Sequence, residues 1–274
     1  MEKRFANGVP AINVQRGVFK FCATCAAVFF AVSIMLVVLY SFVPVRYTPL
    51  MFLRKVEAFS RNERLPLKHE WVPLEQISPD MISAVIESED AHFYEHGGFS
   101  FSDMLDAFYR NRRWGCIVAG GSTISQQTAK NVFCTPSRTY TRKLFEAYFT
   151  VLIELLWGKQ RILEVYLNVI ELGDGVFGVE SAAEEYFCTS ALRLTPRQSD
   201  ALTEVIPCPR CYSRWLYGIE GFSHFLCQSC AVLGQLIKNI TFFKKRDKIL
   251  LLYLQISDFF CNFAGKFTSY LNRV

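Results

Sequence analysis

One acid in this sequence stands where a general base could work. Ser78, Pro79 and Asp80 predict the start of a helix, because a hydroxyl cap, a proline at the first helical position and an acid near the positive end are each favoured there. Apolar side chains follow at three- and four-residue spacing and form one face, which continues to Glu89 and on to Phe93. Burial raises the pKa of a carboxyl, so Glu89 is a candidate base. An acid that only leans out of the core would show the same spacing.

The residues around this acid predict how the helix continues. Glu87 comes two residues earlier, so its side chain is expected to point to solvent. His96 closes the motif EDAHFYEHGGF (residues 89–99), in which Gly97 and Gly98 predict the end of the helix.

A second segment, GGSTISQQTAKN (residues 120–131), is nearly free of bulk in a chain that is 51% hydrophobic. Ser122 and Thr123 predict an N-cap. Four polar side chains then recur at helical spacing, namely Gln126, Gln127, Lys130 and Asn131. Free N–H groups at a helix start, together with a lysine, suit a phosphate or sugar hydroxyls. A solvated surface helix is the alternative, although it would normally carry more Glu and Lys.

A third segment, RTYTRKLFEAYFTVLIELLW (residues 138–157), is covered by apolar side chains over most of its helical circumference, so we expect it to be buried. One narrow polar line crosses it, formed by Lys143, Glu146, Thr150 and Glu154, with Arg138 and Arg142 one turn away. A buried helix with one charged line must direct it at a partner or a cleft. A structural salt bridge between Arg142 and Glu146 is the simpler alternative.

The N-terminal part predicts a membrane anchor. Residues 21–43 carry no charge, and as a helix they would span about 34 Å, slightly more than the hydrocarbon core of a bilayer. Four basic side chains and one acid precede them, which favours a cytoplasmic N-terminus. We prefer an uncleaved anchor to a cleaved signal peptide, because the apolar run is too long for a signal peptide. The rest of the chain would then lie outside the cytoplasmic membrane.

Composition divides the chain into five parts. They are a cytoplasmic tail (1–20), the anchor (21–43), a juxtamembrane connector (44–70), a mostly helical domain (71–213) and a Cys- and Phe-rich helical tail (214–274). That last part could lie on a membrane surface, although packing back on the domain is the preferred interpretation. The net charge is +5, of which the first part contributes four bases minus one acid, so about +2 remains. This balance does not favour nucleic acid as a partner.

Two Cys-x-x-Cys pairs raise the question of a metal. Cys208 and Cys211 are separated from Cys227 and Cys230 by 15 residues, a spacing that zinc sites use. An oxidising compartment favours disulfides instead, and we prefer disulfides or thiols to zinc.

Five ordered motifs resemble the peptidoglycan glycosyltransferase family (family 51), especially its monofunctional biosynthetic transglycosylases. They are SEDAHFYEHGGF, GGSTISQQTAKN, RKLFE, KQRILEVYLN and GVFGVESAAEEYF, in order from residue 88 to residue 187. The resemblance implies a mostly α, lysozyme-like domain with a small membrane-proximal jaw, preceded by one transmembrane helix. It also implies a single-pass protein of the bacterial inner membrane whose catalytic domain lies on the periplasmic side.

The resemblance further implies the substrate and the site. Lipid II and the growing glycan strand would be joined by β-1,4 bonds with release of undecaprenyl diphosphate, and a magnesium or manganese ion is left open as a cofactor. Glu89 matches the general base and Glu146 the second essential glutamate. The basic residues around the diphosphate correspond to Lys130, Arg138 and Lys143, and the polar cleft wall to Ser122, Gln126 and Gln127. We also assign Asn131, Phe93 and His96 to substrate binding. Proteins of cell wall synthesis or division are the expected partners.

The chain departs from the family's pattern at four positions. They are Ser100 in place of Asp, Cys188 in place of Gly, Cys208 in place of Asn, and Glu204 in an apolar stretch. Two alternatives therefore stand beside the polymerase: a lysozyme-like hydrolase or lytic transglycosylase, and a catalytically silent scaffold. Intact Glu89 and Glu146 disfavour the scaffold, and the predicted ring of cations disfavours the hydrolase.

Overall fold

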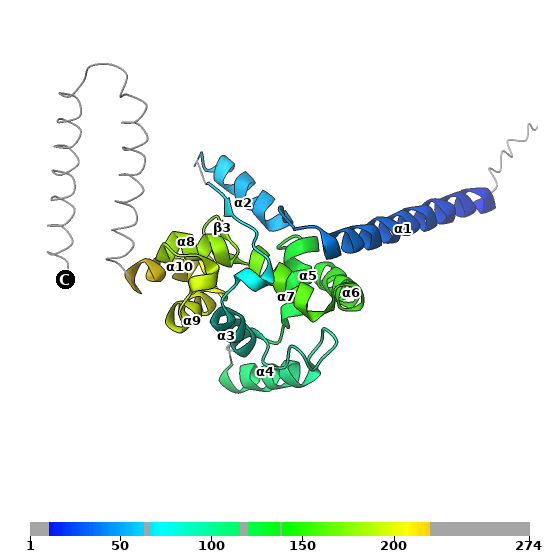
Figure 1. Cartoon of the computed structure of the whole chain (residues 1–274). Helices are drawn as coiled ribbons and strands as arrows, with labels where there is room; N and C mark the ends of the chain where they lie inside the picture. The colour runs from blue at the N-terminus through cyan, green and yellow to red at the C-terminus, as the bar shows by residue number, and fades with distance from the viewer. Residues whose placement is uncertain (1–10, 63–65, 116–119, 138, 220–274) are drawn as a thin grey trace, which may run out of the picture. The chain divides into compact units, whose positions relative to one another are not determined.

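The computed structural model describes residues 11–62, 66–115, 120–137 and 139–219. These residues belong to one compact unit, Met1–Gly221, and are mostly helical (Figure 1), as the periodicity predicts. The second unit, Phe222–Val274, lies outside the described residues, and so do Cys227 and Cys230. The helices are α1 (Ala11–Phe42), α2 (Pro49–Ser60), α3 (Pro79–Glu89), α4 (Phe101–Trp114), α5 (Ile124–Phe133), α6 (Tyr140–Leu156), α7 (Gly158–Val169), α8 (Val179–Phe187), α9 (Pro196–Val205) and α10 (Pro209–Ile219), with short 3-10 turns at Leu74–Gln76 and Ala191–Arg193.

Two groups of helices surround the core. Helix α5 packs against α6 and α7, and α3 packs against α9, which in turn contacts α10 (Figure 1). A small sheet of β1 (Lys68–His69), β3 (Val176–Phe177) and β2 (Glu171–Gly173), in that order, lies beside α8. β1 is parallel to β3, and β2 is antiparallel to it. The Asn168 side chain holds the irregular segment that follows β1, accepting from Val72 N at 2.9 Å and donating to Val72 O at 2.8 Å.

Helix α3 begins as the sequence predicts but ends earlier. Ser78 caps it, with Oγ accepting from Asp80 N at 3.3 Å, and Val85 is fully buried on the inner face. The expectation that the helix runs on to the paired glycines is wrong, because it ends at Glu89. Asp90 has non-helical torsion angles (φ −164°, ψ 72°), and its side chain bonds to groups outside the helix. An aspartate that finds such partners competes with helix continuation.

The small side chains of helix α5 have a packing role that the sequence did not predict. Thr123 caps it and forms a capping box with Gln126. Ser125, Thr128 and Ala129 are fully buried at the place where α5 meets its neighbours. Small side chains let the helices approach closely, so only part of this polar segment faces open space.

Helix α6 is buried on one side only. Phe149 and Ile153 are buried as expected, together with Glu146 (2% exposed) and Thr150 (0%) of the polar line, whereas Leu144 is 71% exposed. The prediction that apolar side chains bury most of the helix is therefore correct only for that side. Apolar periodicity identifies a face that avoids water, but it does not say whether protein or lipid covers that face.

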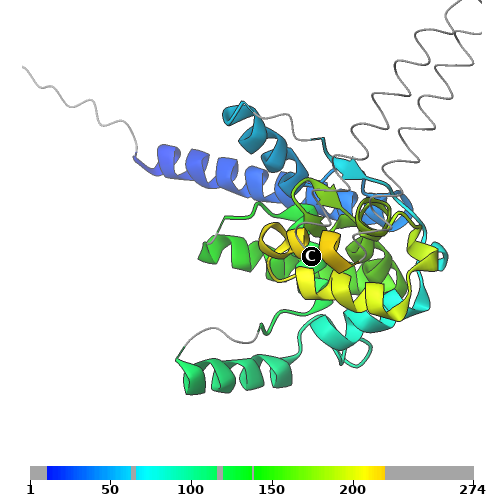
Figure 2. The ribbon, with the colours of Figure 1, turned by 90° about the vertical axis from the view of Figure 1, so that its left-hand side faces the viewer.

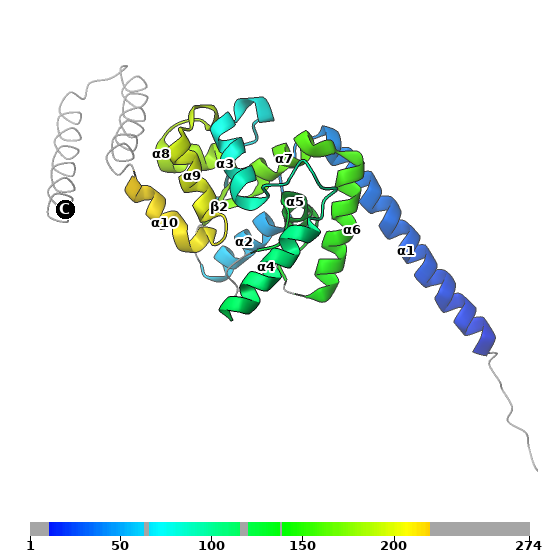
Figure 3. The ribbon, with the colours of Figure 1, turned by 90° about the horizontal axis from the view of Figure 1, so that it is seen from below.

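Helix α1 contacts the compact body along α6 (Figure 3). Within it, Phe19–Phe42 forms the one candidate membrane span in the described part of the chain, with a mean hydropathy of 2.6. Three hydrogen bonds attach the C-terminal half of α1 to the domain. Ser33 Oγ lies 2.7 Å from Tyr148 Oη, and Trp157 Nε1 donates to Val37 O at 2.7 Å. Arg161 donates to Tyr40 O at 2.9 Å.

Helix α4 lies on the lower side of the body (Figures 1 and 2). Ser100, a departure from the family's pattern, caps it by accepting from Asp103 N at 3.3 Å, so the substitution preserves a helix start. Glu204, another departure, is exposed on α9. Cys208 forms a disulfide with Cys211, which removes both from a zinc site.

Candidate active site

A pocket of about 260 Å³ opens where α3 ends and α5 begins. Glu89, Ser122 and Thr123 line one part of it, and Asp103 and Arg110 of α4 line another. Three segments that are distant in the sequence therefore build one pocket, and two of them are the motifs that predicted chemistry.

Glu89 is half-buried and has a fixed hydrogen-bond partner. Gln127 Nε2 donates to Glu89 Oε2 at 2.8 Å, and Tyr166 Oη donates to Gln127 Oε1 at 3.2 Å. The tyrosine thus orients the amide so that its N–H group faces the carboxylate. Burial raises the pKa of Glu89, while the bond from Gln127 and the charge of Lys130 lower it. The acid is therefore more basic than an ordinary carboxylate and still stabilised when ionised.

Asp90 joins the two motifs. Its buried carboxylate accepts from His96 Nε2 at 2.9 Å and from Ile124 N, at the start of α5, at 2.9 Å. His96 Nδ1 accepts from Gly98 N at 3.1 Å, which leaves the ring proton on Nε2 for the bond to Asp90. The start of α5, and with it Gln127, is therefore held in place relative to the end of α3.

A second charged cluster lies on α5 and α6. Glu146 is buried, and its two carboxylate oxygens accept separately from Arg142 and Lys143. Burial lowers the pKa of Lys130, the Glu146 charge raises it, and Arg142 and Lys143 lower it. Lys130 also interacts electrostatically with Glu89. Three cations and one carboxylate leave a net positive charge beside the candidate base.

A polar layer supports the site from inside. Glu154 accepts from Ser125 of α5 and from Lys159 of α7, the latter at 2.8 Å. Lys159 Nζ lies 4.6 Å from the ring centroid of Phe93. The half-buried charges of Glu154 and Lys159 are thus paired within the protein.

The structure brings together most of the residues that the sequence singled out. Ser122 lines the pocket, Gln127 bonds to the candidate base, Lys130 and Asn131 are half-buried on the same helix, and Lys143 pairs with Glu146. Gln126 is 3% exposed, and its side-chain oxygen accepts from Thr123 N in the capping box. Phe93 is fully buried, and His96 is engaged by Asp90, so both lie beneath the site. Arg138 lies outside the described residues.

Sequence reasoning did not find two of the positioning residues. Asp90 follows the candidate base, but its partners lie six and 34 residues away. Tyr166 sits in an apolar run, and nothing in that run indicates a bond to Gln127, 39 residues away. The predicted salt bridge between Arg142 and Glu146 is present, within a larger cationic cluster.

The residues around Glu146 do not fit a divalent cation. Both carboxylate oxygens are already bonded to positively charged groups, and a metal ion there would be repelled by them. Across the ranges that the structure describes, no group of three or more His, Cys, Asp or Glu side chains could hold a metal ion. The cationic side chains themselves supply the positive charge that a metal would provide.

The arrangement can remove a proton on one side and stabilise a developing anion on the other. A base of raised pKa suits a hydroxyl nucleophile, and a cluster of cations suits a phosphate leaving group. Such chemistry belongs to group transfer from a phosphorylated carrier.

Comparison with known proteins agrees with this chemistry. The chain matches the transglycosylase family over residues 56–236. It is 48% identical over 191 residues to the biosynthetic peptidoglycan transglycosylase of Bdellovibrio bacteriovorus, covering 70% of this chain and 76% of that protein. It is 51% identical over 173 residues to the protein of that name in Caulobacter vibrioides (63% and 72% covered), and 43% identical over 192 residues to that of Bacteroides thetaiotaomicron (70% and 77%).

These matches confirm the lysozyme-like helical fold and the enzyme class that the motifs imply. The chain belongs to the transglycosylase family and is a peptidoglycan glycosyltransferase of cell wall synthesis.

Proposed function

We propose that this glycosyltransferase polymerises lipid II, a disaccharide pentapeptide carried on undecaprenyl diphosphate, into β-1,4-linked glycan strands. Glu89 acts as the general base. Lys130, Arg142 and Lys143 stabilise the negative charge of the departing diphosphate. The proposal is supported by one observation: helix α5 carries both Gln127, which bonds to Glu89, and Lys130, and it packs against α6, which carries the Glu146 cluster.

The bond changes balance without a further reactant. The 4-hydroxyl of the acceptor's N-acetylglucosamine gives its proton to Glu89, and the oxygen forms a bond to the anomeric carbon of the donor. The bond from that carbon to the diphosphate oxygen breaks, and its electron pair leaves with the diphosphate. Burial, which raises the pKa of Glu89, makes the ionised carboxylate a better proton acceptor.

The leaving group needs charge stabilisation more than protonation. Glu146 carries the same sign of charge as the diphosphate, so it does not bind that group directly. Instead it holds Arg142 and Lys143 in place beside Lys130. Ser122 lines the pocket and is assigned to sugar hydroxyls, and Gln127 orients Glu89. Arg138 is assigned to the diphosphate from the family resemblance, and Asn131 is assigned to substrate binding.

The apolar helix is proposed to anchor the enzyme beside its lipid-borne substrate. The length and hydropathy of Phe19–Phe42 suit a single span, and the basic residues before it favour a cytoplasmic N-terminus. The domain would then act at the outer face of the inner membrane. Proteins of cell wall synthesis or division remain the predicted partners.

A hydrolase of finished glycan would use the same kind of acid but has no use for a cluster of cations. The Lys130, Arg142 and Lys143 side chains therefore favour synthesis from a diphosphate donor. The intact Glu89 and Glu146 arrangement also gives no support to a catalytically silent scaffold.

The test is incubation of the full-length protein with labelled lipid II, with glycan strands separated on a gel. Wild type is expected to form polymer, and Glu89→Gln to lose it by at least 100-fold, since the base is removed while the shape of the side chain is kept. The melting temperature should stay nearly unchanged.

Glu75→Gln is the matched control, because Glu75 is an exposed acid away from the site. It should polymerise like wild type. If Glu89→Gln polymerises as well as this control, Glu89 is not the base. If wild type only cleaves added glycan, polymerisation itself is wrong.

A further inference from the structure

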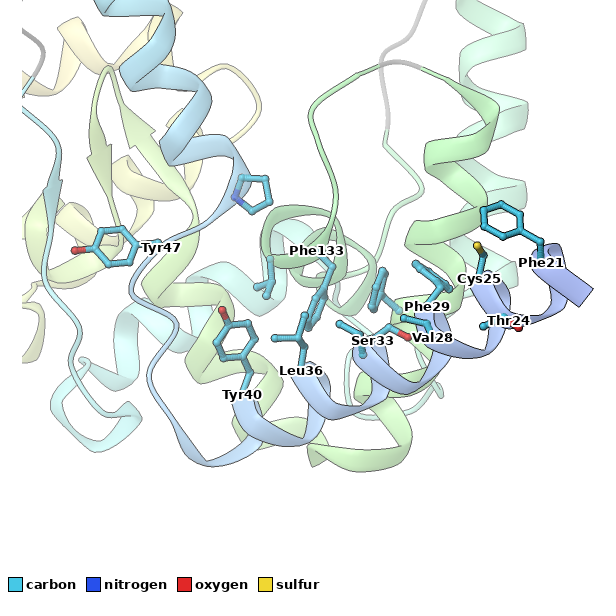
Figure 4. A pocket seen from close by; sticks show the side chains of 14 residues that line it. Phe21, Thr24, Cys25, Val28, Phe29, Ser33, Leu36, Tyr40, Tyr47 and Phe133 are labelled. Carbon is cyan, nitrogen blue, oxygen red and sulfur yellow. The ribbon is translucent and has the colours of Figure 1, made fainter.

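An apolar groove of about 730 Å³ runs along helix α1 on the side that faces the domain. Figure 4 shows side chains of α1, among them Val28, Ser33 and Leu36, facing Phe133 of α5 across it. On α1 the lining reaches from Phe21 to Tyr40, which corresponds to roughly 28 Å at 1.5 Å per residue. The groove is therefore long, and an extended chain would suit it better than a compact molecule.

The Thr24 and Ser33 hydroxyls of its α1 wall already have partners within the protein. Thr24 Oγ1 donates to Lys20 O at 2.9 Å, and Ser33 Oγ bonds to Phe30 O and to Tyr148. No Asp, Glu, Lys or Arg lines this groove in the described part of the chain. The wall thus offers mainly apolar contact area and no charged group, which favours a hydrocarbon.

The groove continues into a pocket with the opposite character. A second cavity, of about 360 Å³, shares Phe29, Phe133 and Phe149 with the groove, so the two adjoin. Its remaining lining is largely hydroxyl-bearing and cationic, formed by Thr135, Ser137, Thr139, Thr141 and Arg142. Within the described residues, the buried Arg142 Nε has no hydrogen-bond partner.

Arg142 connects this path to the active site. Its Nη1 donates to Glu146, in the cluster that also includes Lys143 and acts on Lys130. An anionic head group at the cluster would therefore lie beside the apolar groove, where the two cavities share Phe29, Phe133 and Phe149. The matching ligand is an amphiphile with a phosphate head and one long hydrocarbon tail.

We infer that the groove binds the polyprenyl tail of the donor lipid diphosphate, from substrate binding until the freed carrier departs. This inference rests on the proposed function, which places the leaving diphosphate at the cluster. Holding the tail along α1 would align the diphosphate with Arg142 until the bond to the anomeric carbon breaks.

Two valines on α1 provide a matched pair of variants. Val32 lines the groove and is 45% exposed, whereas Val38 is 42% exposed and does not line it. Val32→Trp fills the groove, and Val38→Trp adds the same bulk to the same helix outside it. The full-length protein in phospholipid nanodiscs is assayed with lipid II and with an analogue that carries a short prenyl chain.

Val32→Trp should lower kcat/KM for the full-length chain by about tenfold and lower it much less for the short-chain analogue, because the long tail loses more apolar contact when the groove is filled. Val38→Trp should change neither. Equal effects on both substrates, or none on either, would overturn the inference. Failure of wild type to polymerise either substrate would instead overturn the proposed function.

Direct binding is measured with a polyprenyl diphosphate that carries a photoreactive group near the end of its tail. Crosslinks are expected on the groove side of Phe21–Tyr40, and they should be suppressed by unlabelled polyprenyl diphosphate but not by phospholipid. Crosslinks all around the helix, or equal competition by phospholipid, would mean that the groove holds bulk membrane lipid.

Discussion

Glu89 works through side chains that come from other parts of the chain. Gln127 bonds to its carboxylate, and Tyr166 fixes the direction of that amide. Asp90 keeps the start of the helix that carries Gln127 next to the end of the helix that carries Glu89. Burial raises the pKa of this carboxylate, and a chain of hydrogen bonds through the interior limits that rise.

Tyr166→Phe should shift the pH dependence of activity. The bond from Gln127 favours the ionised form of Glu89 and lowers its pKa, so an amide without its tyrosine partner can rotate and lose that bond. The pKa of Glu89 would then rise further above its ordinary value. The acidic limb of the kcat/KM profile should move to higher pH by roughly 0.5–1 unit.

Tyr212→Phe removes a hydroxyl from a residue that is 52% exposed, and it should leave the profile in place. A Tyr166→Phe limb that stays in place or moves to lower pH would contradict the positioning role. A loss of kcat/KM that is equal at all pH values would point to a packing defect alone.

The sequence identifies Glu89, Lys130 and Glu146 because each interrupts a local pattern. Glu89 is an acid on an apolar face, Lys130 is a cation in a neutral polar helix, and Glu146 belongs to a charged line on a mostly apolar helix. It does not identify Tyr166 or Asp90 as positioning residues. Their roles depend on partners that only the folded chain brings near, and helical periodicity carries no information about such distant pairs.

The helices contain one departure with a clear conformational cost. Cys188 ends α8 with φ 52° and ψ 38°, in the left-handed region where a side chain is disfavoured. Glycine is the residue that adopts this conformation without strain, and glycine is what the family's pattern has there. The substitution therefore affects the stability of the C-terminal helices more directly than the chemistry.

Cys188→Gly should stabilise the fold by about 1 kcal/mol, because it removes the strain of the Cβ atom. A rise of about 2–4 °C in melting temperature is expected from calorimetry. Cys188→Ala is the control, since it removes the thiol but keeps the Cβ atom, and it should give no such rise. A glycine variant that melts below the alanine variant would contradict this account.

The burial of α6 could not be predicted in the same way. Phe149 and Ile153 face inward as the spacing of apolar side chains predicts, but Glu146 and Thr150 face inward with them, and Leu144 faces outward. Hydrophobic periodicity separates two faces of a helix and leaves open which one packs on the core when a membrane is a possible second environment.

The anchor and the domain are joined by specific contacts. Carbonyls at the end of a helix lack partners within that helix, and at the end of α1 Arg161 donates to Tyr40 O and Val43 O. Trp157 donates to Val37 O one turn earlier. If α1 spans the membrane, these bonds fix the direction in which the active site faces the bilayer.

Arg161→Met should weaken this connection. In bilayer nanodiscs, kcat/KM for lipid II is expected to fall about fivefold, because the site is no longer held facing the membrane. In detergent micelles, where lipid approaches from any direction, activity should remain within about twofold of wild type. Arg193→Met, at an exposed position, serves as the control in both media. Equal losses in nanodiscs and micelles would indicate damage to the domain itself.

The central claim is that Glu89 and the Glu146 cluster face the same sugar–diphosphate bond. The most direct measurement is an experimental structure of the full-length Glu89→Gln protein with a polyprenyl-diphosphate-linked glycan bound as donor. Diphosphate oxygens are expected within about 3.5 Å of Arg142 and Lys130 nitrogens, with the anomeric carbon on the side of residue 89. A diphosphate bound away from these cations, or an anomeric carbon turned away from residue 89, would contradict the account.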